Sequence, residues 1–447
     1  MTKPFRCIVL GAAGRDFHDF RTFFRDHPEF RVVAFTAAQI PFIETRVFPR
    51  SLAGPDYDAD IPIHPEERLA ELVRAHDVDF VCFAYSDVSH EEVMHKASIA
   101  QAAGASFLLL GPKHTQLRSS LPVVAVVATR TGAGKSPLTQ AIARHLVGRG
   151  HRVGVIRHPM PYGDLERQAV QRFATAEDLS RAECTIEERE EYEPYVEMGT
   201  SVYAGVDYVG VLAAAEPGSD VILWDGGNND FSFLAADLVL TVVDPLRAGH
   251  ELRFHPGETN LRMADVVVVS KCSRASEAEL AEVERNAASH APSAAVVRAD
   301  LEVTLDEPEA VRGLRVLVVE DGPTVTHGGM STGAGHVAAE RYGAGAIVDP
   351  RPFAVGSIAE AYARHPHLGP ILPALGYAES QLVELAATIE RAEVDVVIDA
   401  SPAALVSTLG TTKKVVRARY RFAQRTGPDL FALVDRRLSE RVPGESP

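Results

Sequence analysis

The sequence predicts an α/β protein in which parallel strands are covered by helices on both faces. Short apolar runs rich in Val, Ile and Leu alternate with helical patterns, as in doubly wound sheets. Several runs are apolar at every position, which is typical of parallel strands buried on both faces. Helices are expected at 137–148 and 277–288 among others. The expected strands are residues 7–10, 31–35, 80–84, 107–110, 123–128, 153–156, 221–224, 238–243, 266–270, 295–298, 316–319 and 394–398.

The length of the chain allows three domains. A stretch at 112–122 interrupts the periodic pattern, and a Gly-rich stretch begins near residue 321. We therefore predict a Rossmann-like domain at 1–118, a central domain with a parallel sheet at 119–320 and an α/β C-terminal region at 321–447. A basic stretch near the end of the chain, 413–422, is expected to be helical.

Composition and charge exclude several classes of protein. The 447 residues carry a formal net charge of −16, whereas binding nucleic acid requires a basic surface. No apolar stretch approaches the roughly 18 residues of a membrane-spanning helix, and the first apolar run is too short for a secretion signal. The four cysteines form no C-x-x-C pair, which fits a reducing compartment. We therefore expect a cytoplasmic protein that binds neither nucleic acid nor membrane.

A phosphate-binding loop is predicted between the expected strand 123–128 and a helix that has Pro137 in its first turn. The sequence T-R-T-G-A-G-K-S departs from the G-x-x-x-x-G-K-[ST] pattern only at its first position. Glycines let backbone N–H groups converge on phosphate oxygens at the positive end of the helix. Lys135 would contact the β- and γ-phosphates, and the Ser136 hydroxyl would hold Mg²⁺. The expected nucleotide contacts are Thr129, Arg130, Thr131, Gly132, Ala133, Gly134, Lys135 and Ser136.

Two further residues complete the predicted catalytic core. Arg130 occupies the position at which one group of P-loop ATPases carries a second, signature lysine, and it would stabilise the transferred charge together with Lys135. Asp225 follows the expected strand 221–224, at the edge where doubly wound sheets bind ligands. It would join the Mg²⁺ shell directly or through water. A purely structural Asp225, as a turn cap, is the alternative.

The expected nucleotide base is adenine. GTPases carry N-K-x-D after a strand, and its Asp reads the guanine edge. Residues 270–273 read S-K-C-S here, so the Lys is kept while the Asn and Asp are absent. The predicted cofactors are therefore ATP, with GTP less favoured, and Mg²⁺.

The loop after the expected strand 153–156 is a candidate switch or substrate loop because it is polar and rich in Pro and Gly. Arg157 and His158 would contact anionic oxygen. His158 and Asp164 are also catalytic candidates, with Asp164 orienting a nucleophile. A plain connecting loop is the alternative.

Three more residues are candidates for binding an anionic substrate. Arg247 and His250 follow the strand expected at 238–243, and His327 lies in a Gly-rich loop after 316–319. Parallel strands of one sheet bring their C-terminal ends to the same edge, so Arg247 and His250 are expected near Arg157.

The first domain begins like a dinucleotide-binding unit. Gly11 and Gly14 form a shortened G-x-x-G turn after the expected strand 7–10. The second expected strand, 31–35, is not followed by the acidic residue that would hold a ribose. An anion-binding or structural Rossmann-like unit is therefore favoured over a NAD site.

Long stretches between about residue 6 and residue 400 point to one family: GAAGRDFHDF, RTGAGKS, RHPMPYGDL, ECTIEEREEYEP, ILWDGGNNDF, HPGETNLRMADVVV and VLVVEDGPTVTHGGM. These stretches resemble the cyclic 2,3-diphosphoglycerate synthetase-like proteins, also described as predicted GTPases. The resemblance implies a P-loop NTPase that converts ATP and 2,3-diphosphoglycerate into the cyclic product, ADP and phosphate. Phosphoryl transfer would activate one phosphate, and its neighbour would then attack intramolecularly.

The substrate implied by the resemblance is a small polyanion, which Arg157, His158, Arg247 and His250 would hold. The alternative is a nucleotide-dependent regulatory or metallochaperone-like switch that acts through a protein partner, and dependence of turnover on an anionic metabolite distinguishes the two. A third hypothesis is a NAD-dependent enzyme. P-loop proteins with Lys or Arg at the position of Arg130 often work as dimers, so a homodimer is expected.

Overall fold

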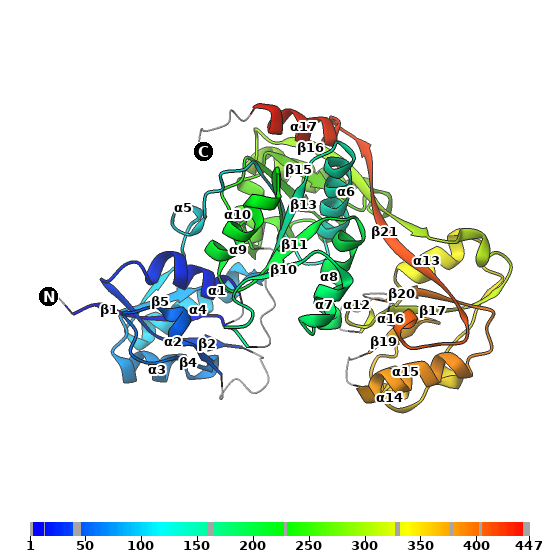
Figure 1. Cartoon of the computed structure of the whole chain (residues 1–447), viewed down its shortest axis with the longest axis horizontal. Coiled ribbons are helices and arrows are strands. Elements are labelled where there is room, and N and C mark those ends of the chain that lie inside the picture. The colour runs from blue at the N-terminus through cyan, green and yellow to red at the C-terminus, as the bar shows by residue number, and fades with distance from the viewer. Residues whose placement is uncertain are drawn as a thin grey trace. The chain divides into compact units, whose positions relative to one another are not determined.

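The computed structural model describes residues 3–12, 14–38, 46–158, 164–227, 230–326, 331–375, 379–401 and 405–440. The chain divides into two compact units, and Figure 1 labels most of their elements. The first unit comprises Met1–Thr175, Tyr195–Asp300 and Gln424–Pro447. The second comprises Ala176–Pro194 and Leu301–Ala423. The domain boundaries near residues 118 and 320 stay predictions.

The first unit begins with a six-stranded sheet in the order β3-β4-β2-β1-β5-β7. All neighbours are parallel except β3 and β4. The first strand lies at the centre, and the chain winds outward from it in both directions, as in a Rossmann-like sheet. The strands are β1 (Phe5–Leu10), β2 (Phe30–Ala37), β3 (Val47–Phe48), β4 (Ile61–Pro65), β5 (Phe80–Phe83) and β7 (Ser106–Leu108). The helices are α1 (Arg15–Asp19), a π-helical turn Phe20–Phe24, α2 (Arg50–Ala53), α3 (Leu69–His76), α4 (His90–Ala103) and α5 (Pro112–Thr115).

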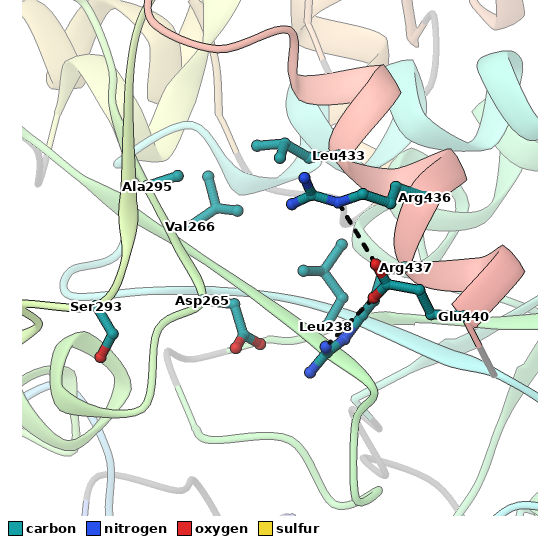
Figure 2. A pocket seen from close by; sticks show the side chains of 9 residues that line it. All are labelled: Leu238, Asp265, Val266, Ser293, Ala295, Leu433, Arg436, Arg437 and Glu440. Atoms are coloured by element: carbon teal, nitrogen blue, oxygen red, sulfur yellow. Dashed lines mark ion pairs between the residues drawn. The ribbon is translucent and has the colours of Figure 1, made fainter.

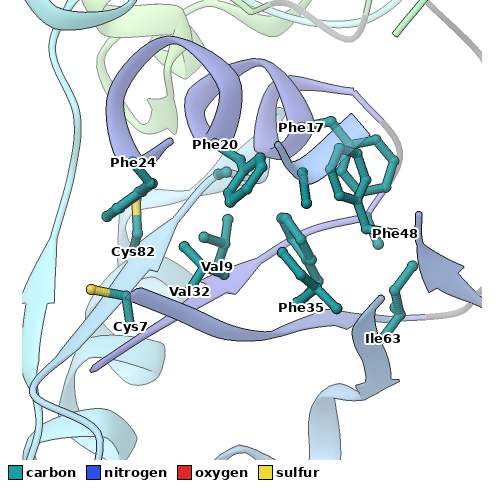
Figure 3. Packing of buried hydrophobic residues seen from close by; sticks show 14 of the residues in the cluster. Cys7, Val9, Phe17, Phe20, Phe24, Val32, Phe35, Phe48, Ile63 and Cys82 are labelled. Atoms are coloured by element: carbon teal, nitrogen blue, oxygen red, sulfur yellow. The ribbon is translucent and has the colours of Figure 1, made fainter. Parts of the chain in front are cut away.

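Helices cover both faces of this sheet because alternate residues of β1 point to opposite sides. Cys7 and Val9 belong to a cluster with the phenylalanines of α1 and the π-helical turn, whereas Ile8 and Leu10 pack with α3 and α4. Figure 3 shows the aromatic side of this core, where Phe17 and Phe20 reach toward the strands and toward Phe48.

The second sheet of the first unit has the order β10-β11-β9-β12-β8-β13-β15-β16. Only β10 is antiparallel to its neighbour. The strands are β8 (Val123–Ala128), β9 (Val153–Arg157), β10 (Gln171–Phe173), β11 (Ser201–Ala204), β12 (Val221–Asp225), β13 (Leu238–Val243), β15 (Val266–Val269) and β16 (Ala295–Leu305), the last of which continues into the second unit. The helices are α6 (Lys135–Gly148), α9 (Tyr208–Ala215), α10 (Gly257–Arg262), α11 (Glu277–His290) and α17 (Leu430–Glu440).

A two-stranded antiparallel pair joins the two sheets of the first unit. It consists of β6 (Val88–Ser89), which follows β5, and β14 (Phe254–His255), which precedes α10. His90 N also donates to Arg253 O at 2.9 Å. This pair places the loop after β5 beside the loops of the second sheet.

The second unit is a smaller α/β sheet in the order β21-β20-β17-β18, with β19 also paired to β17. All these pairs are parallel. Alternate residues of β17 contribute to two cores, one with α13 and one with α14 and α15. The strands are β17 (Arg315–Asp321), β18 (Ala346–Ile347), β19 (Leu372–Ala374), β20 (Val396–Ala400) and β21 (Lys414–Thr426). The helices are α7 (Ala176–Arg181), α8 (Ile186–Glu197), whose last residues from Tyr195 belong to the first unit, α12 (Gly322–Val325), α13 (Ala334–Arg341), α14 (Gly356–Arg364), α15 (Glu379–Arg391) and α16 (Leu405–Thr408).

The structure confirms the predicted α/β class and corrects two details. The basic stretch 413–422 was predicted to be a helix, but from Lys414 onward it belongs to strand β21, in which the buried Val416 and Ala418 alternate with the half-buried Arg417 and the exposed Arg419. Such two-residue alternation is the period of a strand. Helix α6 begins at Lys135, two residues before the predicted start. No helix in the described part of the chain has the length and apolar character of a transmembrane segment.

A pocket of about 200 Å³ lies at the edge of the second sheet away from the phosphate loop. It is lined by the first residues of β13, β15 and β16 together with side chains of α17, where Glu440 is paired with Arg436 and Arg437 (Figure 2). Doubly wound sheets bind ligands at the carboxyl ends of their strands. This pocket, at the strand starts, is therefore not where the predicted site lies.

Candidate active site

The predicted phosphate loop connects β8 to α6. Gly132 and Gly134 have φ of 74° and 111°, a left-handed conformation that favours glycine. Thr129 N donates to Val242 O at 3.0 Å. Gly257 of α10 lies so close to Thr129 that a Cβ on Gly257 would collide with the Thr129 carbonyl. The loop is therefore held by β13 and α10 as well as by its own turns.

Lys135 and Ser136 are the first two residues of α6. Burial lowers the pKa of Lys135 to about 8, and the carboxylates of Asp225 and Asp87 oppose this shift. At neutral pH the side chain therefore still carries its charge, at the positive end of a helix. This combination of a cation and a helix N-terminus suits phosphate oxygens.

Asp225 ends β12 and is fully buried. Its Oδ2 accepts hydrogen bonds from Tyr195 OH, at 2.6 Å, and from Arg157, and its Oδ1 accepts from Thr139 Oγ1 at 3.1 Å. Arg157, the last residue of β9, is directly opposite Asp225 in the sheet and is 2% exposed. The structure thus brings Arg157 to a carboxylate, whereas the sequence predicts that it faces a substrate. Its substrate contact stays a prediction and would require this ion pair to open.

His158 and Asp230 form a second buried pair. His158 Nε2 lies 2.9 Å from Asp230 Oδ2, and Arg15 Nε donates to Asp230 Oδ1 at 2.9 Å. Burial alone would raise the pKa of Asp230, but the Arg15 charge and the contact with His158 outweigh it and lower the pKa. The His158 side chain fits between two glycines, because a Cβ on Gly14 would collide with its ring and a Cβ on Gly227 would collide with its Cβ. Gly14, the second glycine of the G-x-x-G turn, therefore packs on His158. That the turn is structural or anion-binding stays a prediction.

Arg130 points to a third carboxylate. Its Nε donates to Asp87 Oδ1 at 2.7 Å, its guanidinium lies 3.6 Å from the centre of the Phe254 ring, and its NH1 is 2.6 Å from His250 Nδ1. Asp87 Oδ2 also accepts from Thr131 N at 3.3 Å. The structure therefore joins two predicted site residues, Arg130 and His250, around an aspartate of the first sheet.

Arg247 lies on the outer side of the phosphate loop. It pairs with Asp244 at 2.9 Å and donates to Thr131 O at 2.7 Å. Lys271, the lysine of the S-K-C-S segment, pairs with the same aspartate at 2.8 Å and donates to Gly132 O at 2.7 Å. Both cations thus hold the loop through its carbonyl oxygens. The structure does not bring Arg247 to Arg157 and His158.

Two predicted residues are outside this cluster. Asp164 is exposed, and its Oδ1 accepts from Glu166 N and Arg167 N at 2.9 and 3.2 Å, so that it caps a local turn. His327 lies outside the described residues. Their catalytic and substrate roles stay predictions.

Sequence reasoning missed Asp87, Tyr195 and the role of Asp230. Asp87 could have been found, because it follows β5 as Asp225 ends β12, and both lie where strands of a doubly wound sheet end. Tyr195 had no such signal, because α8 brings it to Asp225 from an acidic stretch that reads as a solvated helix. The described residues contain no group of three or more His, Cys, Asp or Glu side chains placed to hold a metal.

Comparison with known proteins identifies a near full-length relative. The arginine synthetase ArcE of Thermococcus kodakarensis is 56% identical over 433 residues, which cover 97% of this chain and 97% of ArcE. The chain belongs to the ArcE family. No family model matches the sequence.

More distant similarities cover parts of the chain. The tetraacyldisaccharide 4'-kinase of Dechloromonas aromatica is 31% identical over 169 residues, which are 36% of this chain and 47% of that kinase. Among solved structures, LpxK from Aquifex aeolicus in complex with ATP gives a TM-score of 0.43 at 13% identity, over 78% of this chain and 95% of LpxK.

Membership of the ArcE family confirms that the protein is an enzyme of the synthetase class. The assignment of the loop at Thr129–Ser136 as its nucleotide site stays a prediction. The long matching stretches thus led correctly to a P-loop enzyme that uses ATP, but the reaction on 2,3-diphosphoglycerate stays a prediction. The homodimer and the cytoplasmic location also stay predictions.

Proposed function

We propose that this protein is an ATP-dependent synthetase that forms arginine. The observation that carries the proposal is the 56% identity to the arginine synthetase ArcE across nearly the whole of both chains. The strand, loop and helix of a P-loop, with Lys135 and Ser136 at the helix start, support the use of ATP.

The chemistry of such a reaction suits a P-loop enzyme. Arginine ends in a guanidinium group, and the shortest precursor is an amino acid that ends in a ureido group. The ureido oxygen is a poor leaving group until the γ-phosphoryl group of ATP is transferred to it. Ammonia can then add to the ureido carbon, and phosphate leaves with that oxygen. The products are arginine, ADP and phosphate, and the protein supplies charge and alignment.

Residues of the site have defined roles in this proposal. Lys135 and Arg130 would neutralise charge on the transferred phosphoryl group, as cations do in other phosphoryl-transfer sites. Mg²⁺ would be held by the Ser136 hydroxyl and phosphate oxygens. Asp225 would act through a water molecule, because both of its oxygens already accept hydrogen bonds. The His158–Asp230 pair is the candidate to take the proton that ammonia releases when it adds to the ureido carbon.

The test is product analysis with the full-length protein, ATP, Mg²⁺, ammonium and citrulline as the ureido amino acid. We expect arginine by mass spectrometry, formed in equal amount to ADP, and no product with Lys135→Ala. A parallel reaction with 2,3-diphosphoglycerate, followed by ³¹P NMR, tests the cyclic product. If no arginine forms and citrulline does not stimulate ATP hydrolysis, the proposal is wrong. Hydrolysis that depends on no metabolite would support the regulatory switch.

A further inference from the structure

The guanidinium of Arg130 is held by a set of groups that recognise its shape. Phe254 covers one face at 3.6 Å, the Asp87 carboxylate binds its edge at 2.7 Å, and His250 Nδ1 lies 2.6 Å from NH1. Burial, followed by the charges of Arg130 and Arg247, lowers the pKa of His250, so its ring is neutral near pH 7 and Nδ1 can accept a hydrogen bond. An aromatic face, a carboxylate and a neutral acceptor together fit a planar, delocalised group.

Asp87, His250 and Phe254 are held in place by contacts that do not involve Arg130. Phe254 belongs to β14, which pairs with β6, and β6 begins at the residue after Asp87. The His250 ring stacks on Phe254 with the ring centres 4.9 Å apart. Arg130 contributes only its side chain, which projects from the phosphate loop. The pocket of Asp87, His250 and Phe254 can therefore keep its shape when Arg130 leaves.

The pocket also adjoins the phosphate loop. Asp87 Oδ2 accepts from Thr131 N at 3.3 Å, and the Asp87 carboxylate is close enough to Lys135 to raise its pKa. A group bound in the pocket would thus lie beside the phosphates that Lys135 contacts. The side chains of Arg130 and Asp87 are 17% and 19% exposed, so Arg130 can be exchanged for a ligand from solvent.

We propose that Asp87, His250 and Phe254 form the binding site for the ureido or guanidino end of the amino-acid substrate, and that Arg130 occupies this site until it turns to the nucleotide phosphates. The inference rests on the proposed function, and it names where the reacting end of that substrate binds. Asp87 binds the N–H groups of the ureido substrate and of the arginine product, and Phe254 stacks on their planar face. Competition with Arg130 makes substrate binding depend on nucleotide.

The experiment measures binding of L-arginine to the full-length protein by calorimetry, with and without Mg·ADP. We expect Asp87→Asn to weaken arginine binding at least about thirtyfold, because a charged contact is lost. Phe254→Leu should weaken it roughly tenfold. Arg130→Ala should instead tighten it by at least about fivefold without nucleotide, because the internal guanidinium no longer competes. Below pH 7, where Lys135 keeps its charge in both proteins, Mg·ADP binding should not weaken in Asp87→Asn.

Asp77→Asn is the matched control, because Asp77 is also an aspartate with a left-handed φ (51° against 59° for Asp87) but pairs with Lys3 at the surface. It should bind arginine like the parent. The assignment of the pocket would be wrong if Asp87→Asn left arginine binding unchanged, or if Arg130→Ala did not raise the affinity for arginine. This holds even if the enzyme makes arginine. If the enzyme makes no arginine but binds agmatine, with Asp87→Asn weakening and Arg130→Ala tightening that binding, the pocket stands and the proposed function fails.

Discussion

Two arginine–aspartate pairs flank the phosphate loop, and they are built differently. Arg157 and Asp225 end adjacent strands, their side chains are 3% and 0% exposed, and Tyr195 donates to the same carboxylate. Arg130 and Asp87 lie on two loops and are 17% and 19% exposed. Opening the first pair would leave a charge without water, whereas water can replace either partner of the second. An arginine and an aspartate can thus form a fixed support in one place and an exchangeable contact in another.

The largest effect is expected when the buried pair is broken. Arg157→Ala should lower the free energy of unfolding by about 3–5 kcal/mol, because it leaves the Asp225 carboxylate buried without its cation. Urea unfolding followed by circular dichroism measures this change. Arg152→Ala is the control. Arg152 directly precedes β9, the strand that Arg157 ends, but it pairs with Asp220 at the surface. If both variants unfold at the same urea concentration, the buried pair is not a fixed support.

Lys135, whose pKa both aspartates raise, should be the most important residue for turnover. Lys135→Ala should reduce kcat by roughly 10²–10³-fold or more, because it removes a cation from the developing phosphoryl charge. Its unfolding midpoint should stay near that of the parent. Steady-state ADP release measures the effect, and Lys113→Ala, at an exposed lysine, is the control. Turnover equal to that of the parent would contradict the assignment of the phosphate loop.

A pH titration tests how the two aspartates act on Lys135. Its pKa of about 8 lies below the value in the unfolded chain, so the ammonium is lost as pH rises through 8 in the folded protein. ATP affinity should therefore fall above pH 8, approaching about tenfold per pH unit if only the ammonium binds. Between that pH and the unfolded pKa the folded state binds fewer protons, so the free energy of unfolding should rise with pH.

Calorimetry with ATP at pH 7, 8 and 9 measures the affinity. The decline should begin at lower pH in Asp87→Asn, because the Asp87 carboxylate raises the pKa of Lys135. Lys135→Ala should show no such decline. If ATP affinity fell equally with pH in Lys135→Ala, the fall would come from the titration of another group.

The smallest effect is expected when the exposed pair is broken. Arg130→Ala should change the free energy of unfolding by less than about 1 kcal/mol, because partly exposed ion pairs contribute little. The same urea titration measures it. A loss comparable with that of Arg157→Ala would show that Arg130 is part of the fixed support and would count against its exchange with substrate.

Much of the fold followed from local patterns. The run 123–128 is apolar at every position, the run 238–243 is apolar at all but Thr241, and both form central strands of a parallel sheet. The loop between β8 and α6 could be predicted because its glycines, its lysine and the flanking elements are contiguous in the chain. The stretch 413–422 was mistaken for a helix because its basic residues obscured the two-residue alternation of β21.

The partners of the charged side chains could not be predicted in the same way. Arg157 and Arg247 both follow predicted strands, yet one lies against Asp225 and the other holds the back of the phosphate loop. Asp87 comes from another sheet and is 43 residues from Arg130 in the sequence. No periodicity or motif spacing records such a contact.

The sequence by itself determined the α/β class, the position of the loop between β8 and α6 and the residues at the ends of most strands, because local propensity and contiguous motifs decide them. Only the tertiary structure decided which cation each carboxylate meets. Strand order and the β6–β14 pair bring Asp87 to Arg130, while the register of β9 and β12 buries Arg157 against Asp225. An ion pair depends on distance and on exclusion of water, and both arise only when separate segments pack.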